Sequence, residues 1–246
     1  MSGHSKWSTI KHKKGALDAK RGRIFTRLIK EITVAARMGG GNADGNPRLR
    51  AAIAEAKANN MPADNIKRAI QKGTGELPGV TYEEKTYEGY GPGGAAVLIQ
   101  AMTDNANRTT SELRHLLSKH GGNLAEANAV AWMFERKGYF VVPGNGVSED
   151  SLLEIILEAG GEDLRDDGDN FEVFTPPEAY EAVHKALEAN KIPVSAAEIS
   201  MISQNSVHLE GKRAQQILSL MEALEDHDDV QKVFSNFDID ASEIRE

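Results

Sequence analysis

The chain has 246 residues and no cysteine, which excludes disulfides, thiolate nucleophiles and Cys-ligated zinc. Its 40% hydrophobic and 27% charged residues are typical of a globular protein, and its length predicts two or three domains. There is no apolar run long enough for a membrane span and no signal-peptide pattern, so we expect a cytoplasmic protein.

The net charge of −8 hides a division of the chain into a basic and an acidic part. Residues 1–73 contain 16 Lys and Arg against 5 Asp and Glu, whereas the remaining residues contain 13 against 32. A basic segment in an otherwise acidic chain predicts contact with a polyanion, such as nucleic acid. A solvated basic face without a partner is the alternative.

Residues 1–15 have no apolar period and consist mainly of small, polar and cationic residues. This composition predicts a basic flexible arm. Cations suit phosphates, and a Trp among them can stack on a base. The candidate nucleic-acid contacts in the arm are Lys6, Trp7, Lys11, His12, Lys13 and Lys14.

Residues 16–75 are predicted to form a three-helix bundle. The first helix shows apolar residues at three- and four-residue steps and ends at the glycines of 39–41, while Gly22 weakens its first turn, so we expect the firm helix to start near Arg23. A basic stripe lies opposite the apolar face and is expected to face outward as a phosphate contact. Its members are Lys20, Arg23, Arg27 and Lys30, and Arg21, which falls on the apolar arc, is a further candidate contact.

Asn46 and Pro47 predict the start of a second helix, and a third begins near Pro62 or Asp64 and stops at Gly73. The third helix carries two further candidate contacts, Lys67 and Arg68. The last two helices could form a helix-turn-helix, although the intervening turn is long and favours a plain bundle.

The acidic part predicts α/β structure. We expect strands at 80–89, 95–103 and 129–135 with a helix at 109–120, followed by a strand-helix-strand-strand-helix-strand series typical of a ferredoxin-like domain. A helix at 211–225 and a strand at 230–237 complete the first set. The predicted fold class is therefore α+β multidomain, with a helical bundle and two α/β domains. Its parts are the arm 1–15, the bundle 16–75, a discontinuous α/β domain 80–136 plus 205–246, and an inserted ferredoxin-like domain 137–204.

No stretch carries a strong catalytic or metal-binding pattern. The glycine-rich Tyr90–Gly94 is followed by a strand, so a hairpin turn is favoured over a phosphate loop, with stacking on Tyr87 and Tyr90 as the alternative. The acidic run at 163–169 is interpreted as a solvated hairpin tip, and the run at 222–229 as a solvated helix end that could also repel nucleic acid. Arg108, at a loop-to-helix junction, is a further candidate contact. We predict no catalytic residue, metal or cofactor.

Five motifs, in order, resemble the YebC/PmpR family over nearly the whole chain. The matching segments are MSGHSKWSTIKHKKGALDAKRGRIFTRLIKEI, NPRLRAAIAEAKANNMPADNIKRAI, YEGYGPGG, TDNANRTTSELRHLLSKHGGNL and VAWMFERKG. The resemblance implies three domains around a central cavity and a bacterial, cytoplasmic regulator described as binding DNA in transcription. It also implies kinship with a mitochondrial translational activator of cytochrome oxidase and with ribosome-associated members that relieve stalls at proline-rich sequences.

The function predicted from these observations is a non-enzymatic, nucleic-acid-binding regulator of gene expression that acts on promoter DNA. The alternative is a translation factor that binds ribosomal RNA or tRNA. The expected partners are accordingly nucleic acid and the transcription machinery or the ribosome, with no membrane.

Overall fold

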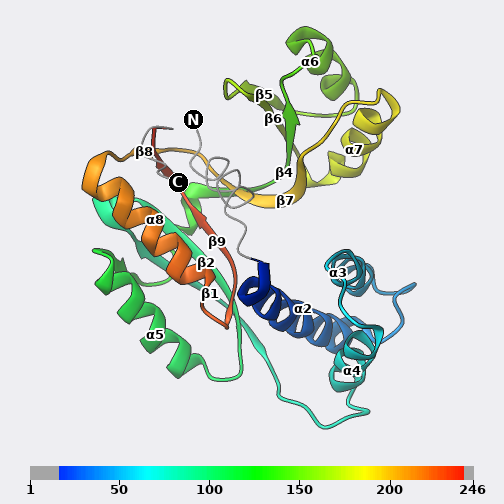
Figure 1. Ribbon diagram of the computed structural model, residues 1–246, viewed down its shortest axis with the longest axis vertical. Coiled ribbons are helices and arrows are strands. Elements are labelled where there is room, and N and C mark those ends of the chain that lie inside the picture. The colour runs from blue at the N-terminus through cyan, green and yellow to red at the C-terminus, as the bar shows by residue number, and fades with distance from the viewer. Residues whose placement is uncertain (1–16, 241–246) are drawn as a thin grey trace.

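The computed structural model describes residues 17–240, and their side chains from residue 22 onward. Its elements form a helical bundle and two antiparallel sheets whose helices lie on their outer sides (Figure 1). Within the described residues, no helix is both long enough and apolar enough to cross a membrane.

The bundle consists of three helices that share one apolar core. They are α2 (Leu17–Gly39), α3 (Pro47–Ala58) and α4 (Ala63–Thr74). The core is built from Leu28 and Ile32 of α2, Leu49 of α3 and Ile66 of α4, together with small Ala side chains. Both α3 and α4 make most of their helix contacts with α2 rather than with each other. This arrangement is a three-helix bundle organised around α2.

The ends of these helices follow local sequence signals. Asn46 accepts a hydrogen bond from the backbone N–H of Leu49 at 3.1 Å and Pro47 is the first helical residue, as predicted. Two expected ends were wrong. Helix α2 is continuous through Gly22, because one glycine costs a helix only about 1 kcal/mol. Helix α4 continues past Gly73, where a Cβ would lie 2.4 Å from the Thr33 carbonyl oxygen, so glycine allows α4 to approach α2 closely.

The first sheet has the strand order β3-β1-β2-β9, and β9 lies antiparallel beside β2. The chain therefore returns to this sheet after completing the second one. Its elements are β1 (Glu83–Tyr90), β2 (Ala96–Thr103), β3 (Asn123–Leu124), β9 (Val230–Ser235), α5 (Ala106–Lys119) and α8 (Gly211–Glu225). Helices α5 and α8 cover one face through a core that contains Val97, Leu113 and Ile217. Beside the sheet, β8 (Val207–His208) pairs in parallel with β10 (Phe237–Asp238).

The second sheet has the order β5-β6-β4-β7, with every neighbouring pair antiparallel. Its elements are β4 (Phe134–Pro143), α6 (Glu149–Glu158), β5 (Asp163–Asp166), β6 (Asn170–Thr175), α7 (Tyr180–Ala189) and β7 (Ala196–Ser203). Helices α6 and α7 cover one face, with Phe140, Leu152 and Val183 in the core between them. Short 3-10 helices occur at η1 (Pro92–Gly94), η2 (Ala131–Met133) and η3 (Pro177–Ala179).

The predicted strand at 129–135 was wrong. Residues 131–133 form η2, and Phe134 begins β4, which pairs with β6 and β7 of the second sheet rather than with the first sheet. The polar run Glu135–Lys137 interrupts the apolar pattern in the middle of this one long strand, so the sequence suggests two segments where the backbone forms one.

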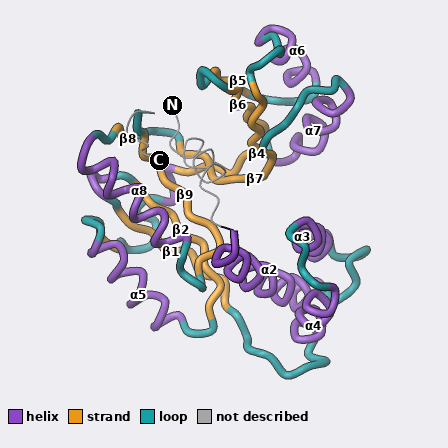
Figure 2. The backbone as a smooth tube through the Cα atoms, in the orientation of Figure 1, coloured by secondary structure: helices purple, strands orange, loops and turns teal. Residues whose placement is uncertain are grey.

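The two sheets meet through apolar contacts. Phe134 of β4 packs with Ala96, Leu98 and Phe234, which are residues of β2 and β9 on the face away from α5 and α8. Figure 2 shows β4 and β7 running from this contact into the second sheet. We call this contact the apolar seam. The contact between the bundle and the first sheet is different, because each apolar core cluster lies entirely inside or entirely outside the described part of the bundle.

Candidate nucleic-acid interface

The basic stripe of α2 lies against the acidic segment that follows α8. Arg23 forms an ion pair with the Asp226 carboxylate, and Arg27 donates to the Glu225 carbonyl oxygen. Carbonyls at the end of a helix lack partners within that helix, so the cations of α2 meet the negative end of α8. We call the contact of Arg23, Arg27 and Lys30 with residues 225–229 the charged seam.

Asp229 is the centre of the charged seam. Its buried carboxylate accepts hydrogen bonds from Lys30 Nζ at 2.7 Å, from Arg108 at 2.8 Å and from Thr109 Oγ1 at 2.7 Å. The Lys30 ammonium also donates to the carbonyl oxygens of Asp228 at 2.9 Å and Met102 at 3.3 Å. Donors from α2 and α5 therefore converge on one carboxylate next to β9.

This geometry shifts the pKa values of Asp229, Arg27 and Arg108. Burial alone would raise the pKa of the Asp229 carboxyl, but the hydrogen bonds from Lys30, Arg108 and Thr109 outweigh it and hold that pKa well below its usual value. Burial also lowers the pKa of Arg27, and the hydrogen bond with Asp229 raises that of Arg108. Asp229 is accordingly ionised at neutral pH.

Two more cations of the bundle extend the contact. Arg48 forms bidentate hydrogen bonds with both Glu31 and Glu84, the second of which belongs to β1. Arg37 donates to the carbonyl oxygen of Tyr82. In the part of the chain described here, every side-chain hydrogen bond or ion pair between the bundle and the first sheet joins a bundle cation to an oxygen.

The prediction of an outward-facing stripe was therefore wrong for Lys30, which is only 6% exposed. Arg23 and Arg27 are half-buried in the same contact, and Arg108 is shared between Asp104 and Asp229. The expectation that the run at 222–229 is a solvated end was also wrong for Asp229. Helical spacing places the cations on one side of α2, but it does not say what covers that side. The available signal in the sequence was Val34, an apolar residue one turn beyond Lys30 on the side of the cations. In the structure this side chain is 1% exposed, so this side of α2 is covered.

Other predicted contacts lie elsewhere. Lys67 and Arg68 are exposed on α4, and no carboxylate of residues 22–240 pairs with them. Lys20 and Arg21 belong to α2, but their side chains lie outside the described set. The arm candidates also fall outside the described residues; they are Lys6, Trp7, Lys11, His12, Lys13 and Lys14. The structure thus separates Lys67 and Arg68 from the cations of the charged seam.

The glycine-rich stretch is the hairpin turn between β1 and β2, where Gly93 and Gly94 adopt positive φ angles of 70° and 82°. Its two tyrosines are half-buried, and their hydroxyls donate to the carbonyls of Ala106 and Ala129. The stacking alternative is therefore not favoured, because both rings are held within the fold.

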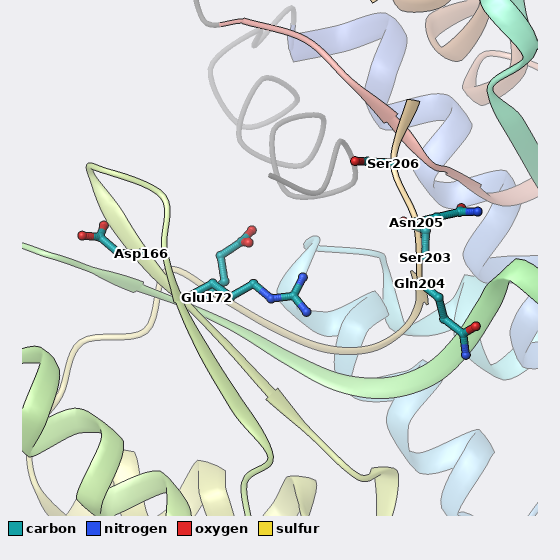
Figure 3. Close-up of a pocket in the computed structure, with 7 residues that line it drawn as sticks. Asp166, Glu172, Ser203, Gln204, Asn205 and Ser206 are labelled. Carbon is teal, nitrogen blue, oxygen red and sulfur yellow. The ribbon is translucent and has the colours of Figure 1, made fainter. Parts of the chain in front are cut away.

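Sequence reasoning missed two polar cavities. One, of about 530 Å³, opens beside the charged seam and is lined by Thr26, Tyr82 and the acids around Asp229. The other, of about 390 Å³, lies between the β5–β6 hairpin and the segment 203–206 (Figure 3). In the second, the buried Glu172 accepts a hydrogen bond from the Tyr139 hydroxyl at 2.8 Å. No His, Cys or Lys is among the described residues that line that cavity, and its ionisable side chains are Arg165, Asp166 and Glu172.

Two groups of side chains have the spacing of metal ligands. They are Glu112, His227 and Asp229, and His208, Glu210 and Asp240. Both groups are accounted for by hydrogen bonds. His227 Nδ1 accepts the backbone N–H of Asp229 at 3.1 Å and Nε2 lies 2.8 Å from Glu112. His208 lies 3.1 Å from both Asp238 and Glu210, which raises its pKa.

Known proteins match the chain along most of its length. Residues 5–76 match the model of the "TACO1/YebC protein N-terminal domain", and residues 82–237 match that of the "TACO1/YebC second and third domain". A "probable transcriptional regulatory protein" of Acidobacterium capsulatum is 62% identical over 243 residues, 99% of this chain and 98% of that relative. A relative from Geobacter sulfurreducens with the same description is 58% identical over 99% and 98% of the two chains.

A solved structure shows the same overall fold. The crystal structure of a conserved hypothetical protein from Aquifex aeolicus is 49% identical and superposes with a TM-score of 0.77, covering 91% of this chain and 92% of that one. The mixed helical and antiparallel-sheet architecture is therefore shared with an experimentally determined relative.

Proposed function

The chain belongs to the TACO1/YebC family, and we propose that it is a non-enzymatic regulator of gene expression that binds nucleic acid through its basic N-terminal third. The observation that carries the proposal is the distribution of its cations. In α2, the described cations Arg23, Arg27 and Lys30 are engaged within the chain. Lys67 and Arg68 of α4, by contrast, are exposed and unpaired among the described residues. Together with the cations of 1–15, they supply a phosphate-binding surface.

Promoter DNA is the first candidate target, because the similar proteins are named as transcriptional regulators. In this account α4 and the arm hold the phosphate backbone. Lys67 and Arg68 contribute charge, which fixes position on the duplex without reading its sequence. The two acidic α/β units contact protein or shape the complex, as their negative charge disfavours DNA.

Ribosomal RNA or tRNA is the second candidate, and the packing of the bundle favours it. Helices α3 and α4 pack on α2 rather than on each other, so they do not form an isolated helix-turn-helix unit that would place a recognition helix in a major groove. An arm that combines Lys, Gly, His and Trp suits folded RNA, in which unstacked bases and phosphates are both accessible.

We also propose how the acidic part of the chain is divided into domains. Residues 80–136 and 205–246 act as one discontinuous α/β domain, and 137–204 act as a ferredoxin-like domain inserted into it. The return of β9 to the side of β2 supports this division. We place the protein in the cytoplasm, where both candidate targets are found in bacteria.

Crosslinking in cells, with sequencing of both the bound DNA and the bound RNA, tests the proposal. Recovery of a defined set of promoters supports the transcriptional version, and recovery of ribosomal RNA or tRNA supports the translational one. Recovery of neither above a control without crosslinking would overturn both versions.

The contribution of the arm is tested in vitro by deleting residues 2–14. Fewer phosphate contacts should weaken binding and flatten the dependence of log K on log salt. Trp7→Ala in the full chain should cost about 1–3 kcal/mol if the ring stacks on a base. A deletion variant with unchanged affinity and slope would remove the arm from the proposal.

A further inference from the structure

The charged seam has the chemistry of a nucleic-acid interface formed within one chain. Arg23, Arg27 and Lys30 face four negative or partly negative groups of the acidic segment. These groups are the carboxylates of Asp226 and Asp229 and the carbonyl oxygens of Glu225 and Asp228. A phosphate backbone presents a similar row of negative oxygen acceptors to the same kinds of donor.

We infer that Arg23, Arg27 and Lys30 of α2 form a second nucleic-acid surface, which residues 225–229 cover in this structure. The phosphates of a bound nucleic acid displace residues 225–229 from these three side chains. The inference rests on the proposed function and deepens it, because it names a surface that becomes available only after the bundle separates from the first sheet.

The composition of the seam permits this separation. No apolar cluster of the described residues joins the bundle to the first sheet. Val34, 1% exposed on this side of α2, is the apolar side chain that separation uncovers. The Arg23–Asp226 pair is open to solvent, with side chains 35% and 49% exposed, and the cavity of about 530 Å³ lies next to it. Exposed ion pairs contribute little stability and are screened by salt.

The buried pair in the seam is also compatible with opening. When Lys30 leaves, the Asp229 carboxylate keeps its hydrogen bonds from Arg108 and Thr109, so it is not left as an isolated buried charge. Lys30 in turn gains water or a phosphate. The connection between α4 and β1, residues 75–82, has no regular structure and is exposed from 75 to 81. Its eight residues can span roughly 26 Å when extended, enough to let the bundle move away.

Two labels report the separation directly. The chain has no cysteine, so Ala54→Cys on α3 and Ser219→Cys on α8, both exposed, provide the only attachment sites for a fluorescent donor and acceptor. The probes are a short random-sequence DNA duplex and a structured RNA hairpin. We expect either probe, once bound, to lower the energy-transfer efficiency. Raising NaCl from about 0.05 to about 0.5 M should lower it without a probe.

A matched pair of charge variants tests the competition. Asp226→Asn removes the partner of Arg23, and Asp150→Asn removes an equal charge from an exposed position on α6. Both change the net charge equally, so the difference between them reports the seam. We expect Asp226→Asn to bind either probe about two- to fivefold more tightly than Asp150→Asn, as expected for loss of one exposed pair.

The outcomes separate this inference from the proposed function. Binding of a probe with unchanged energy transfer, and equal affinities for the two variants, would show that the charged seam is a permanent joint and would overturn only the inference. Failure of every variant to bind either probe at low salt would overturn both. A lower transfer efficiency on binding, with tighter binding by Asp226→Asn, supports both.

Discussion

The two seams of the molecule differ in what holds them together. The apolar seam joins the two sheets through Phe134, Phe234 and other apolar side chains. The charged seam joins the bundle to the first sheet through Lys30 and Asp229. Hydrophobic burial is insensitive to ordinary salt concentrations and has no alternative partner in a nucleic acid. Ion pairs can exchange one anion for another. The comparison indicates that the apolar seam is the joint less sensitive to salt, and under our proposal the bundle is the part that responds to nucleic acid.

The largest expected effect comes from removing the centre of the charged seam. Asp229→Ala leaves the Lys30 ammonium, only 6% exposed, without its carboxylate, and removing one partner of a buried pair costs about 3–5 kcal/mol. Denaturant unfolding measures this loss. Asp228→Ala is the control, because the exposed Asp228 contributes its backbone carbonyl, which the substitution keeps. Equal stabilities of the two variants would contradict the role given to Asp229.

The apolar seam should instead lose stability when a side chain is truncated and leaves a cavity. Phe134→Ala removes a 7% exposed ring and should cost about 3 kcal/mol, with a cost that stays the same at low and high salt. Trp132→Ala, at a 64% exposed position two residues earlier, should change the stability little. A Phe134→Ala cost that shrinks as salt is raised would remove the distinction between the seams.

Acid should weaken the charged seam specifically. The pKa of Asp229 is lower in the folded chain than in the unfolded chain. The contribution of its carboxylate to folding stability is therefore fully present above the pKa of the unfolded chain, about 4. That contribution is lost as the pH falls below this value through the folded pKa. Hydrogen exchange of α2 and of β4 between neutral pH and about pH 3 should show α2 losing protection first. Loss of protection in β4 before α2 would argue against the role of Asp229 in the charged seam.

A smaller effect is expected at the edge of the charged seam. Arg48→Met keeps a long apolar side chain but removes the bidentate pairs with Glu31 and Glu84. Exposed pairs contribute about 1 kcal/mol or less, so the stability loss should be of that size at low salt and should decrease as salt is raised. Arg50→Met, on the same helix and bonded only to carbonyls of 43 and 44, is the control.

Local features of the fold could be predicted from the sequence. The Asn46 cap, the bounds of α8 and the hairpin turn at 91–94 all follow from residue types within a few positions of one another. The two-residue strands β3 and β8 could not be predicted, because so short a pairing leaves no periodic pattern.

The charged seam could not be predicted for a different reason. It joins residues about 200 positions apart, Lys30 and Asp229 among them, and opposite charge alone does not determine which groups meet. The stripe on α2 was found, but its partner was not. A stripe of cations that covers an acidic segment and a stripe that faces solvent have the same helical period, and only the tertiary packing distinguishes them.

The central claim is that the exposed basic residues of the bundle bind the phosphate backbone. The most direct test is the slope of log K against log salt for the full chain and for the double variant Lys67→Glu with Arg68→Glu, using the DNA duplex and the RNA hairpin. Lys185→Glu, at an exposed position on α7, is a charge-reversal control outside the bundle, and it changes the net charge by −2 against −4 for the double variant. We predict that the double variant loses about two units of slope, one for each phosphate contact, while Lys185→Glu keeps the original slope. Equal slopes for all three proteins would contradict the account.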